Sequence, residues 1–311
     1  MMYAVAKTEQ NETFWHPKFW PIWLLLGILR IIVALPQGIR MAVGRSLGRF
    51  FYIFAAKRKR IALVNLQACF PEKPPEWHQQ ILKKHFDSLG MAVIETGMCW
   101  WTPDEKLIPL TKVHGIENLQ QALARNKGVI LLGGHFTSIE LGLRLLKPNT
   151  SATIYPVYQR HGNPLLEHII TSNRLKHAEA VITSDDVRSM LRALKNNGAL
   201  WYAPDQAYHG KNTEMVPFFD VAAPSNTSTS RLAKLTGAAV IPLIMRRRED
   251  NAGYELYLYP AFNDFPSEDP IEDTARYHQL VEKEIIKSPQ QYLWVHKRFK
   301  NRPPEYKNLY E

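Results

Sequence analysis

Cysteine is scarce in this sequence of 311 residues, which contains only Cys69 and Cys99. Two cysteines cannot build a disulfide framework, and these two do not have the spacing of metal ligands. We therefore expect two buried thiols in a reducing compartment, with no metal and no other cofactor. The sequence also lacks internal repeats, low-complexity tracts and flexible Gly/Ser linkers. That absence favours one main domain over a string of several domains.

Acidic residues are outnumbered by basic ones, 29 to 39, which gives a formal net charge of +10. Positive charge attracts nucleic acid, an anionic membrane surface or an acidic protein, and composition alone does not rank the three. The sequence has no helix-turn-helix, zinc-finger or RNP-type pattern, so we expect no nucleic-acid partner. Three basic runs are the strongest candidates for contact with an anionic partner: Lys57–Arg60, Arg246–Arg248 and Lys297–Lys300.

One long apolar segment is present, from Phe19 to Leu35, and its only charged residue is Arg30. Its seventeen residues are at the lower limit for a helix that spans a bilayer. Basic residues are far more frequent after the segment than before it, which predicts that the rest of the chain is cytoplasmic. We predict a membrane anchor, either single-pass or lying in the membrane plane. A long buried core helix is the alternative, because Arg30 is costly in mid-bilayer.

The remainder of the chain predicts an α/β fold. Residues 41–105 have helical spacing interrupted by prolines, and after residue 113 short apolar runs alternate with amphipathic segments. This alternation predicts a largely parallel sheet with helices on both faces. We expect a tail and anchor over residues 1–40 and a cytoplasmic-face domain over residues 41–311, with a helical lead-in to about 112. Expected strands cover 128–132, 152–158, 199–203, 238–244 and 254–259; expected helices cover 137–146, 164–178, 185–197, 225–236 and 273–287.

The segment 129–140 contains the clearest chemical signal: a buried strand that ends in Gly133-Gly134, then His135, then the start of a helix. Sites of α/β proteins lie beyond the carboxyl ends of parallel strands. On one continuous helix, His135 and Glu140 would point about 140° apart, so they can pair only if His135 lies in the turn. Glu140 would then hold the imidazole in one tautomer, as the aspartate of a catalytic triad does. Alternatively, Thr137-x-x-Glu140 fits a helix capping box, and Glu140 is structural.

A second motif, Gly44-Arg-Ser46-Leu-Gly48, matches the nucleophile elbow of serine hydrolases. That elbow requires a strand before the serine and a helix after it. The match instead lies inside a continuous amphipathic stretch with helical spacing. We therefore do not expect Ser46 to be a nucleophile.

The arrangement His135-x4-Glu140 resembles the signature of the glycerolipid, or lysophospholipid, acyltransferase superfamily. Its surroundings resemble one branch, the late lauroyl and myristoyl acyltransferases of bacterial lipid A biosynthesis. The similarity extends from near residue 16 to near residue 303, and five stretches in the same order support it. They are His16–Trp23, Asn65–Pro71, His135–Glu140, Trp201–Asp205 and Gln291–Lys300.

The resemblance implies an enzyme at the cytoplasmic face of the cell inner membrane. Its acyl donor would be acyl carrier protein, and its acceptor Kdo-bearing lipid IVA or a partly acylated product. The other implied partner is the anionic lipid of that membrane. The family's catalytic pair corresponds to His135 and Glu140, and the arginine and aspartate grouped with it correspond to Arg174 and Asp205. The sequence after Arg174 and after Asp205 departs from close relatives, which leaves the acceptor hydroxyl and the chain length open. The C-terminal stretch is closer to the lauroyl-type enzymes than to the myristoyl-type.

The substrates suggest a mechanism without a serine nucleophile. A thioester is already activated, so His135 would act as general base on the acceptor hydroxyl while Glu140 orients it. Arg174 would meet a phosphate or the developing oxyanion, for which backbone N–H groups near Gly133-Gly134 are alternative donors. Asp205 would hold Arg174 or the acceptor sugar. The competing hypotheses are a superfamily member that acts on a glycerophospholipid or other glycolipid, and a non-catalytic membrane-tethered binding protein.

Overall fold

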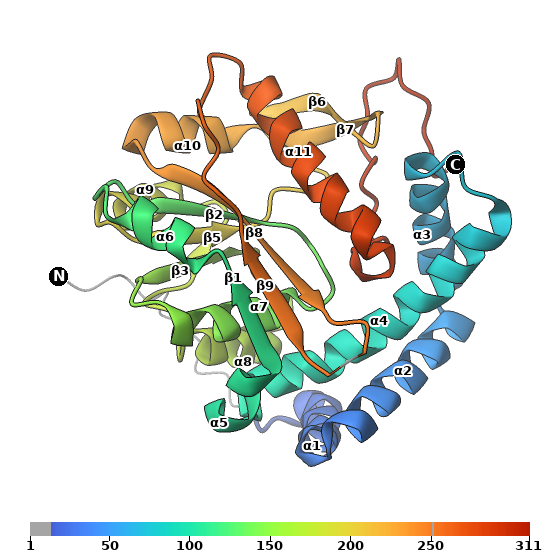
Figure 1. The fold of residues 1–311 in the computed structure, drawn as a ribbon. Helices are drawn as coiled ribbons and strands as arrows, with labels where there is room; N and C mark the ends of the chain where they lie inside the picture. The colour runs from blue at the N-terminus through green and yellow to red at the C-terminus, as the bar shows by residue number, and fades with distance from the viewer. Residues whose placement is uncertain (1–13, 251) are drawn as a thin grey trace.

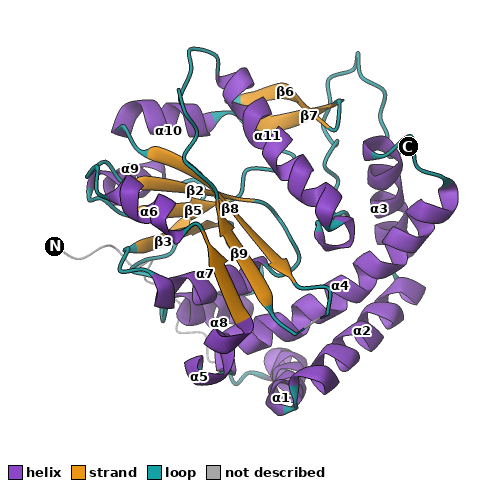
Figure 2. Cartoon of the chain, viewed as in Figure 1, coloured by secondary structure: helices purple, strands orange, loops and turns teal. Residues whose placement is uncertain are grey.

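The computed structural model describes residues 14–250 and 252–311 and shows a mixed α/β fold (Figures 1 and 2). A seven-stranded sheet has the strand order β1-β9-β8-β2-β5-β3-β4. Neighbouring strands run parallel except for β8 and β9. The largely parallel sheet that the sequence predicts is thus confirmed. The strands are β1 (Thr111–His114), β2 (Val129–Gly133), β3 (Ile154–Tyr158), β4 (Ile182–Thr183), β5 (Ala199–Tyr202), β8 (Ala239–Arg247) and β9 (Tyr254–Leu258).

Helices cover both faces of this sheet because its central strands are apolar on both sides. In β2, Ile130 and Leu132 belong to one buried cluster, whereas Val129 and Leu131 belong to another on the opposite face. One face is covered by α9 (Val187–Lys195), α10 (Ser228–Thr236) and α11 (Pro270–Lys287). The other is covered by α6 (Ile116–Leu123), α7 (Ile139–Leu146) and α8 (Pro164–Arg174).

A helical layer precedes the sheet and flanks one end of it (Figure 1). It consists of α1 (Trp20–Ala34), α2 (Gln37–Phe54), α3 (Ala56–Cys69), α4 (Pro75–Trp101) and the short α5 (Asp104–Leu107). Glycines let α2 and α4 approach closely: a Cβ on Gly90 would lie 2.1 Å from the carbonyl oxygen of Gly44 and 2.3 Å from the amide nitrogen of Gly48. The glycines of the Gly-x-Ser-x-Gly match therefore serve helix packing. Ser46 is in mid-helix, where its hydroxyl donates to the Ala42 carbonyl, so the structure agrees that it is no nucleophile elbow.

The apolar helix α1 is mostly exposed. Residues Pro17–Ala34 are long and apolar enough to cross a membrane, and only 11% of that window is buried. This low burial contradicts the alternative of a buried core helix. The exposed large side chains on α1 are Trp20, Leu24, Leu25, Ile28 and Ile31.

The sequence patterns missed β1, β4, α6 and a hairpin made of β6 (Thr213–Phe218) and β7 (Val221–Asn226). Prolines at 217 and 224 argue against strands, but a two-stranded ladder has free edges that tolerate them. The two-residue turn consists of Phe219 and Asp220, both with positive φ, as a type I′ turn requires. Because that turn normally selects Asn-Gly, Phe-Asp gives no recognisable hairpin signal.

Candidate active site

The loop between β2 and α7 presents His135 at the carboxyl end of the sheet. The C-terminal segment fixes this loop through its backbone. The Leu293 N–H donates to the His135 carbonyl at 2.9 Å, and the Thr137 N–H donates to the Gln291 carbonyl at 2.7 Å. From α11, the Tyr277 hydroxyl donates to the Gly133 carbonyl. The loop is therefore held from two sides before any substrate binds.

The His135 ring pairs with Asp205. Nδ1 lies 2.6 Å from Asp205 Oδ1, and the His135 backbone N–H donates to Oδ2 at 2.8 Å. The parallel register explains how the two meet. Leu132 on β2 is opposite Tyr202 on β5, and the same offset of 70 residues brings His135 opposite Asp205. The pair thus extends the strand register three residues beyond the sheet.

Asp205 is fully buried and stays ionised because of its partners. Burial alone would raise the pKa of the Asp205 carboxyl, but the His135 charge and hydrogen bonds outweigh burial and hold the pKa at about 2. An ionised carboxylate can only accept hydrogen bonds, so the bonded Nδ1 carries the ring proton. The other ring nitrogen, Nε2, is then unprotonated in the neutral imidazole and can act as a base.

Glu140 pairs with Arg174 rather than with His135. Arg174 Nε and Nη2 donate to the two Glu140 carboxylate oxygens at 3.0 and 2.7 Å. The Arg174 guanidinium also lies over the Tyr158 ring, 5.5 Å from its centroid. Burial by itself would lower the pKa of Arg174, but the Glu140 carboxylate outweighs it and raises the pKa. Arg174 therefore remains a cation in a bidentate pair.

These contacts correct two predictions about partners. Glu140 was expected to orient the imidazole, and Asp205 to hold Arg174 or the acceptor sugar. The structure instead shows that Asp205 pairs with His135 and that Glu140 pairs with Arg174. The spacing argument failed because strand register brings a distant carboxylate closer to Nδ1 than the helix can. The capping-box alternative also fails, since α7 begins after Ser138 without a side-chain cap and both Glu140 oxygens bind Arg174.

His135, Glu140 and Arg174 all line a cavity of about 860 Å³. Its volume is in the range of small-molecule and cofactor sites. Much of the wall is apolar and comes from several elements around the carboxyl ends of β3 and β5. The apolar lining residues include Ile139, Leu143, Val157, Met190, Leu191, Trp201, Leu232 and Leu235. An extended apolar group could therefore lie beside the polar pairs.

Comparison with known proteins identifies the family. The model of the bacterial lipid A biosynthesis acyltransferase family matches residues 7–301. The chain belongs to that family. It is 37% identical over 301 residues to the lipid A biosynthesis palmitoleoyltransferase of Escherichia coli (strain K12). The aligned region covers 96% of this chain and 97% of that relative. It is 36% identical over 292 residues to the lauroyltransferase of the same organism, covering 93% and 94%.

A third relative has a lower sequence identity to this chain. The lipid A biosynthesis myristoyltransferase of Escherichia coli (strain K12) is 24% identical over 297 residues, covering 95% of this chain and 92% of the relative. This lipid A acyltransferase is therefore more similar to the lauroyltransferase than to the myristoyltransferase, in the direction that its C-terminal stretch indicates. Identity does not separate the lauroyltransferase from the palmitoleoyltransferase.

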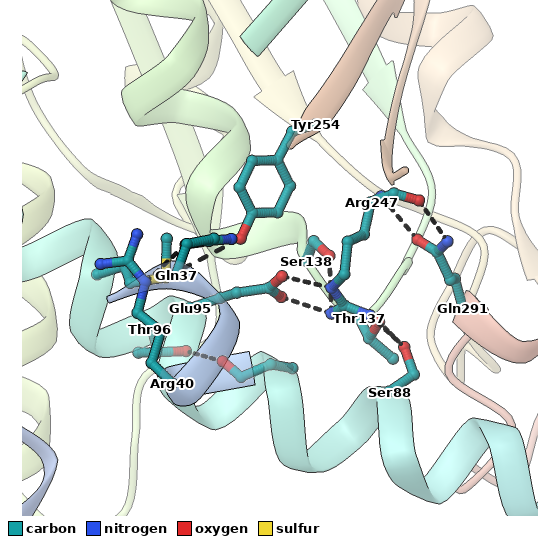
Figure 3. Close-up of polar contacts among 12 residues, drawn as sticks. Gln37, Arg40, Ser88, Glu95, Thr96, Thr137, Ser138, Arg247, Tyr254 and Gln291 are labelled. Atoms are coloured by element: carbon teal, nitrogen blue, oxygen red, sulfur yellow. Dashed lines mark hydrogen bonds and ion pairs between the residues drawn. The ribbon is translucent and has the colours of Figure 1, made fainter. Parts of the chain in front are cut away.

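The sequence patterns did not reveal a buried polar network beside the His135 loop (Figure 3). Arg247, at the end of β8, donates from Nε and Nη2 to Glu95 at 2.6 and 2.7 Å. It also donates to Ser88 at 3.0 Å and to Ser138 at 3.2 Å. The Gln291 side chain makes two hydrogen bonds to the Arg247 backbone: it accepts from the N–H and donates to the carbonyl. Arg247 thus joins α4, the His135 loop and the C-terminal segment.

The basic runs are accordingly less exposed than the sequence suggests. Arg247 is 3% exposed, and Arg298 is 2% exposed with donations to the Pro224 carbonyl and Ser225 hydroxyl. Both belong to the interior, so the expectation that these two residues contact an anionic partner is wrong. Only their position within a charged run was visible in the sequence, and a run does not reveal which member turns inward.

Removing Arg247 should destabilise the fold strongly. Arg247→Met leaves Glu95 as a buried, unpaired charge, and breaking such a pair typically costs ~3–5 kcal/mol. Arg248→Met is the matched control, because its pair with Asp250 is partly exposed and worth about 0–1 kcal/mol. Thermal unfolding of both variants in detergent measures the difference. Equal melting temperatures would contradict a stabilising role for the network.

Proposed function

We propose that this acyltransferase transfers a fatty-acyl group from acyl carrier protein to a hydroxyl of a lipid A precursor. The acceptor is Kdo-bearing lipid IVA or its acylated product. The observation that supports this most is the His135–Asp205 pair at the wall of a partly apolar cavity. The related enzymes named for palmitoleoyl, lauroyl and myristoyl transfer support the reaction class. The test is release of free carrier-protein thiol that depends on the lipid acceptor.

In the proposed reaction, His135 Nε2 takes the proton of the acceptor hydroxyl while that oxygen attacks the thioester carbonyl carbon. Asp205 keeps Nδ1 protonated and stabilises the imidazolium that forms. The tetrahedral intermediate collapses with cleavage of the carbon–sulfur bond. The leaving thiolate receives the proton from His135, so the products are an ester and a thiol and the enzyme regains its starting state.

Arg174 is our proposed stabiliser of negative charge in the same cavity. Glu140 uses the Nε and Nη2 edge of the guanidinium, which fixes its plane. A guanidinium has five N–H donors, so others remain to meet the oxyanion or a phosphate of the acceptor. The His135 amide already donates to Asp205, so it is not a free oxyanion donor. Glu140 therefore acts as a positioning residue for Arg174.

Variants of this second pair should reduce turnover without unfolding the protein. Arg174→Lys loses the bidentate geometry, and Glu140→Gln loses the counter-charge that orients Arg174. Charge-assisted hydrogen bonds are worth ~1.5–3 kcal/mol, so we expect roughly 10–100-fold slower transfer for each. Arg188→Lys, on an exposed position of α9, is the control. Full activity of Glu140→Gln together with unfolding of Glu140→Ala would favour a purely structural Glu140.

We also propose that α1 anchors the enzyme to the cell inner membrane with the remaining domain on the cytoplasmic face. The exposed apolar side of α1 continues onto α2, where Ile39, Phe50, Phe51, Ile53 and Phe54 are exposed. Exposed apolar surface of this kind marks membrane or protein contact. On α3, the basic run Lys57–Arg60, of which all but Lys59 are exposed, would then face anionic lipid or the acidic carrier protein.

Membrane association should therefore depend on α1 and, more weakly, on α2. Cell fractionation is expected to place the full chain in the membrane pellet, and a variant that lacks residues 1–40 should be largely released. Residual binding of that variant would come from the apolar face of α2. Recovery of the intact, unaggregated full chain in the supernatant without detergent would contradict the proposed anchor.

A further inference from the structure

A second cavity, of about 500 Å³, lies where α1 meets α2 and the end of α4. Three of its lining residues are basic: Arg30, Arg40 and Lys106. None of the lining residues in the described part of the chain is acidic. The others are Val33, Ala34, Leu35, Pro36, Gln37, Trp101, Thr102 and Pro103. The cavity thus concentrates positive charge without an internal counter-ion.

Arg40 is the most unusual member because it is only 7% exposed. Its Nε donates to the Gln37 side-chain oxygen at 2.6 Å and its Nη1 to the Val33 carbonyl at 3.2 Å. Both acceptors are neutral, and burial lowers the pKa of this guanidinium. A buried cation is costly unless a negative charge compensates it. The charge of Glu95, which Figure 3 draws in the same region, is already matched by Arg247, to which both carboxylate oxygens bind.

The other two basic side chains lie at the open side of the cavity. Arg30 and Lys106 are exposed, and the Arg30 guanidinium lies 5.7 Å from the centroid of the Trp101 ring. Within residues 14–250 and 252–311, no ion pair joins a carboxylate to any of the three cations. An anion that entered from the open side, where Arg30 and Lys106 are exposed, would meet three positive charges.

Apolar surface adjoins this positive cavity. Ile28 and Ile31 on α1 are 46% and 69% exposed, and Ile39 on α2 is 52% exposed. These side chains lie within a few residues of Arg30 and Arg40. The combination of a cationic cavity and neighbouring exposed aliphatic side chains matches a molecule with a negatively charged head and an apolar tail.

We propose that this cavity binds the phosphate of an anionic bilayer phospholipid, with the acyl chains of that lipid along the exposed face of α1. The phosphate supplies the missing counter-charge for Arg40, and Arg30 and Lys106 hold it from the open side. The inference rests on the proposed membrane placement of α1, and it is independent of the acyl-transfer reaction. The site is separate from the catalytic cavity, with which it shares no lining residue.

Native mass spectrometry of the delipidated full chain in detergent tests the proposal. Phosphatidylglycerol is added in one series and phosphatidylcholine in another. We expect retention of one phosphatidylglycerol and weak retention of phosphatidylcholine. The double variant Arg30→Gln/Lys106→Gln should retain phosphatidylglycerol about 10-fold or more weakly, since it loses two charge-assisted contacts. It keeps Arg40, so its fold should remain intact, as thermal unfolding can verify.

The matched control is Arg125→Gln/Lys127→Gln, which removes the same charges from the exposed α6–β2 loop. This control should retain phosphatidylglycerol like the wild type. Equal retention by the two double variants, or equal retention of both lipids, would overturn the proposed headgroup site. Displacement of the lipid by inorganic phosphate at an equal concentration would show a simple anion site and overturn the lipid assignment. Membrane fractionation of Arg30→Gln/Lys106→Gln separates these outcomes from a failure of the anchor. The variant keeps α1, so it should still be found in the membrane pellet if α1 is the anchor.

Discussion

Replacing His135 with alanine is expected to slow acyl transfer by ~10²–10⁴-fold, the range typical for loss of a general base. The fold should survive, because the loop is held by backbone contacts to Gln291 and Leu293 that do not involve the ring. The measurement is the initial rate of acceptor-dependent thiol release, with thermal unfolding as the check on structure.

His177→Ala is the matched control for this variant. His177 lines the same cavity, but the described part of the chain gives its ring no carboxylate hydrogen bond. Burial lowers the pKa of His177 to about 4, so it is neutral at physiological pH without a group to orient it. We expect a small effect. If His177→Ala reduced the rate of thiol release as much as His135→Ala, the result would contradict a specific role of His135 as the general base.

Replacing Asp205 with asparagine should impair the enzyme nearly as much as the loss of His135. The His135 backbone N–H can only donate, so it would hold the amide oxygen and turn the amide NH₂ toward Nδ1. The ring proton would then move to Nε2, which could no longer accept a proton. The equivalent change costs about 10⁴-fold in a serine-protease triad, and we expect ~10²–10⁴-fold here.

One spectroscopic readout and one control variant separate this tautomer effect from simple destabilisation. Nitrogen-15 shifts of the His135 ring should show the proton on Nε2 in Asp205→Asn and on Nδ1 in the wild type. Asp185→Asn, at the wall of the same cavity, should leave both rate and tautomer unchanged. Wild-type activity of Asp205→Asn would show that the His135–Asp205 pair is structural.

The low pKa of Asp205 also predicts how stability depends on pH. The folded-state pKa is about 2, below the ordinary value of 3.8. The ionised carboxylate therefore stabilises the fold above pH 3.8, and this contribution is lost as the pH falls toward 2. The difference in unfolding free energy between the wild type and Asp205→Asn should shrink over that interval.

The family resemblance groups His135, Glu140, Arg174 and Asp205 in one candidate site, but it does not show how they pair. The strand-to-helix turn around His135 is a local pattern, so it is readable from neighbouring residues. The partner of Nδ1 depends on strand order and register, which place Asp205 beside His135 across 70 residues. A single sequence contains no direct signal for which strands are neighbours, so the nearer carboxylate looked like the better partner.

The buried pair of Glu95 and Arg247 could not be predicted from the sequence for a similar reason. Glu95 resembles one more charge on a long helix, and Arg247 resembles the middle of an exposed basic run. Their pairing across 152 residues depends on how α4 packs beneath the end of β8. Local periodicity shows which residues form a helix, whereas the burial of a charge depends on what the helix meets.

The most direct test of this account is mass spectrometry of a lipid A precursor incubated with acyl carrier protein bearing one defined acyl chain. With the wild-type enzyme we predict a mass increase of one acyl chain on the lipid and an equal amount of free carrier thiol. With His135→Ala, both products should fall together by ~10²–10⁴-fold. An acylated lipid formed at an undiminished rate by His135→Ala would contradict the proposed role of His135. Wild-type thiol release without acylated lipid would contradict the proposed acceptor.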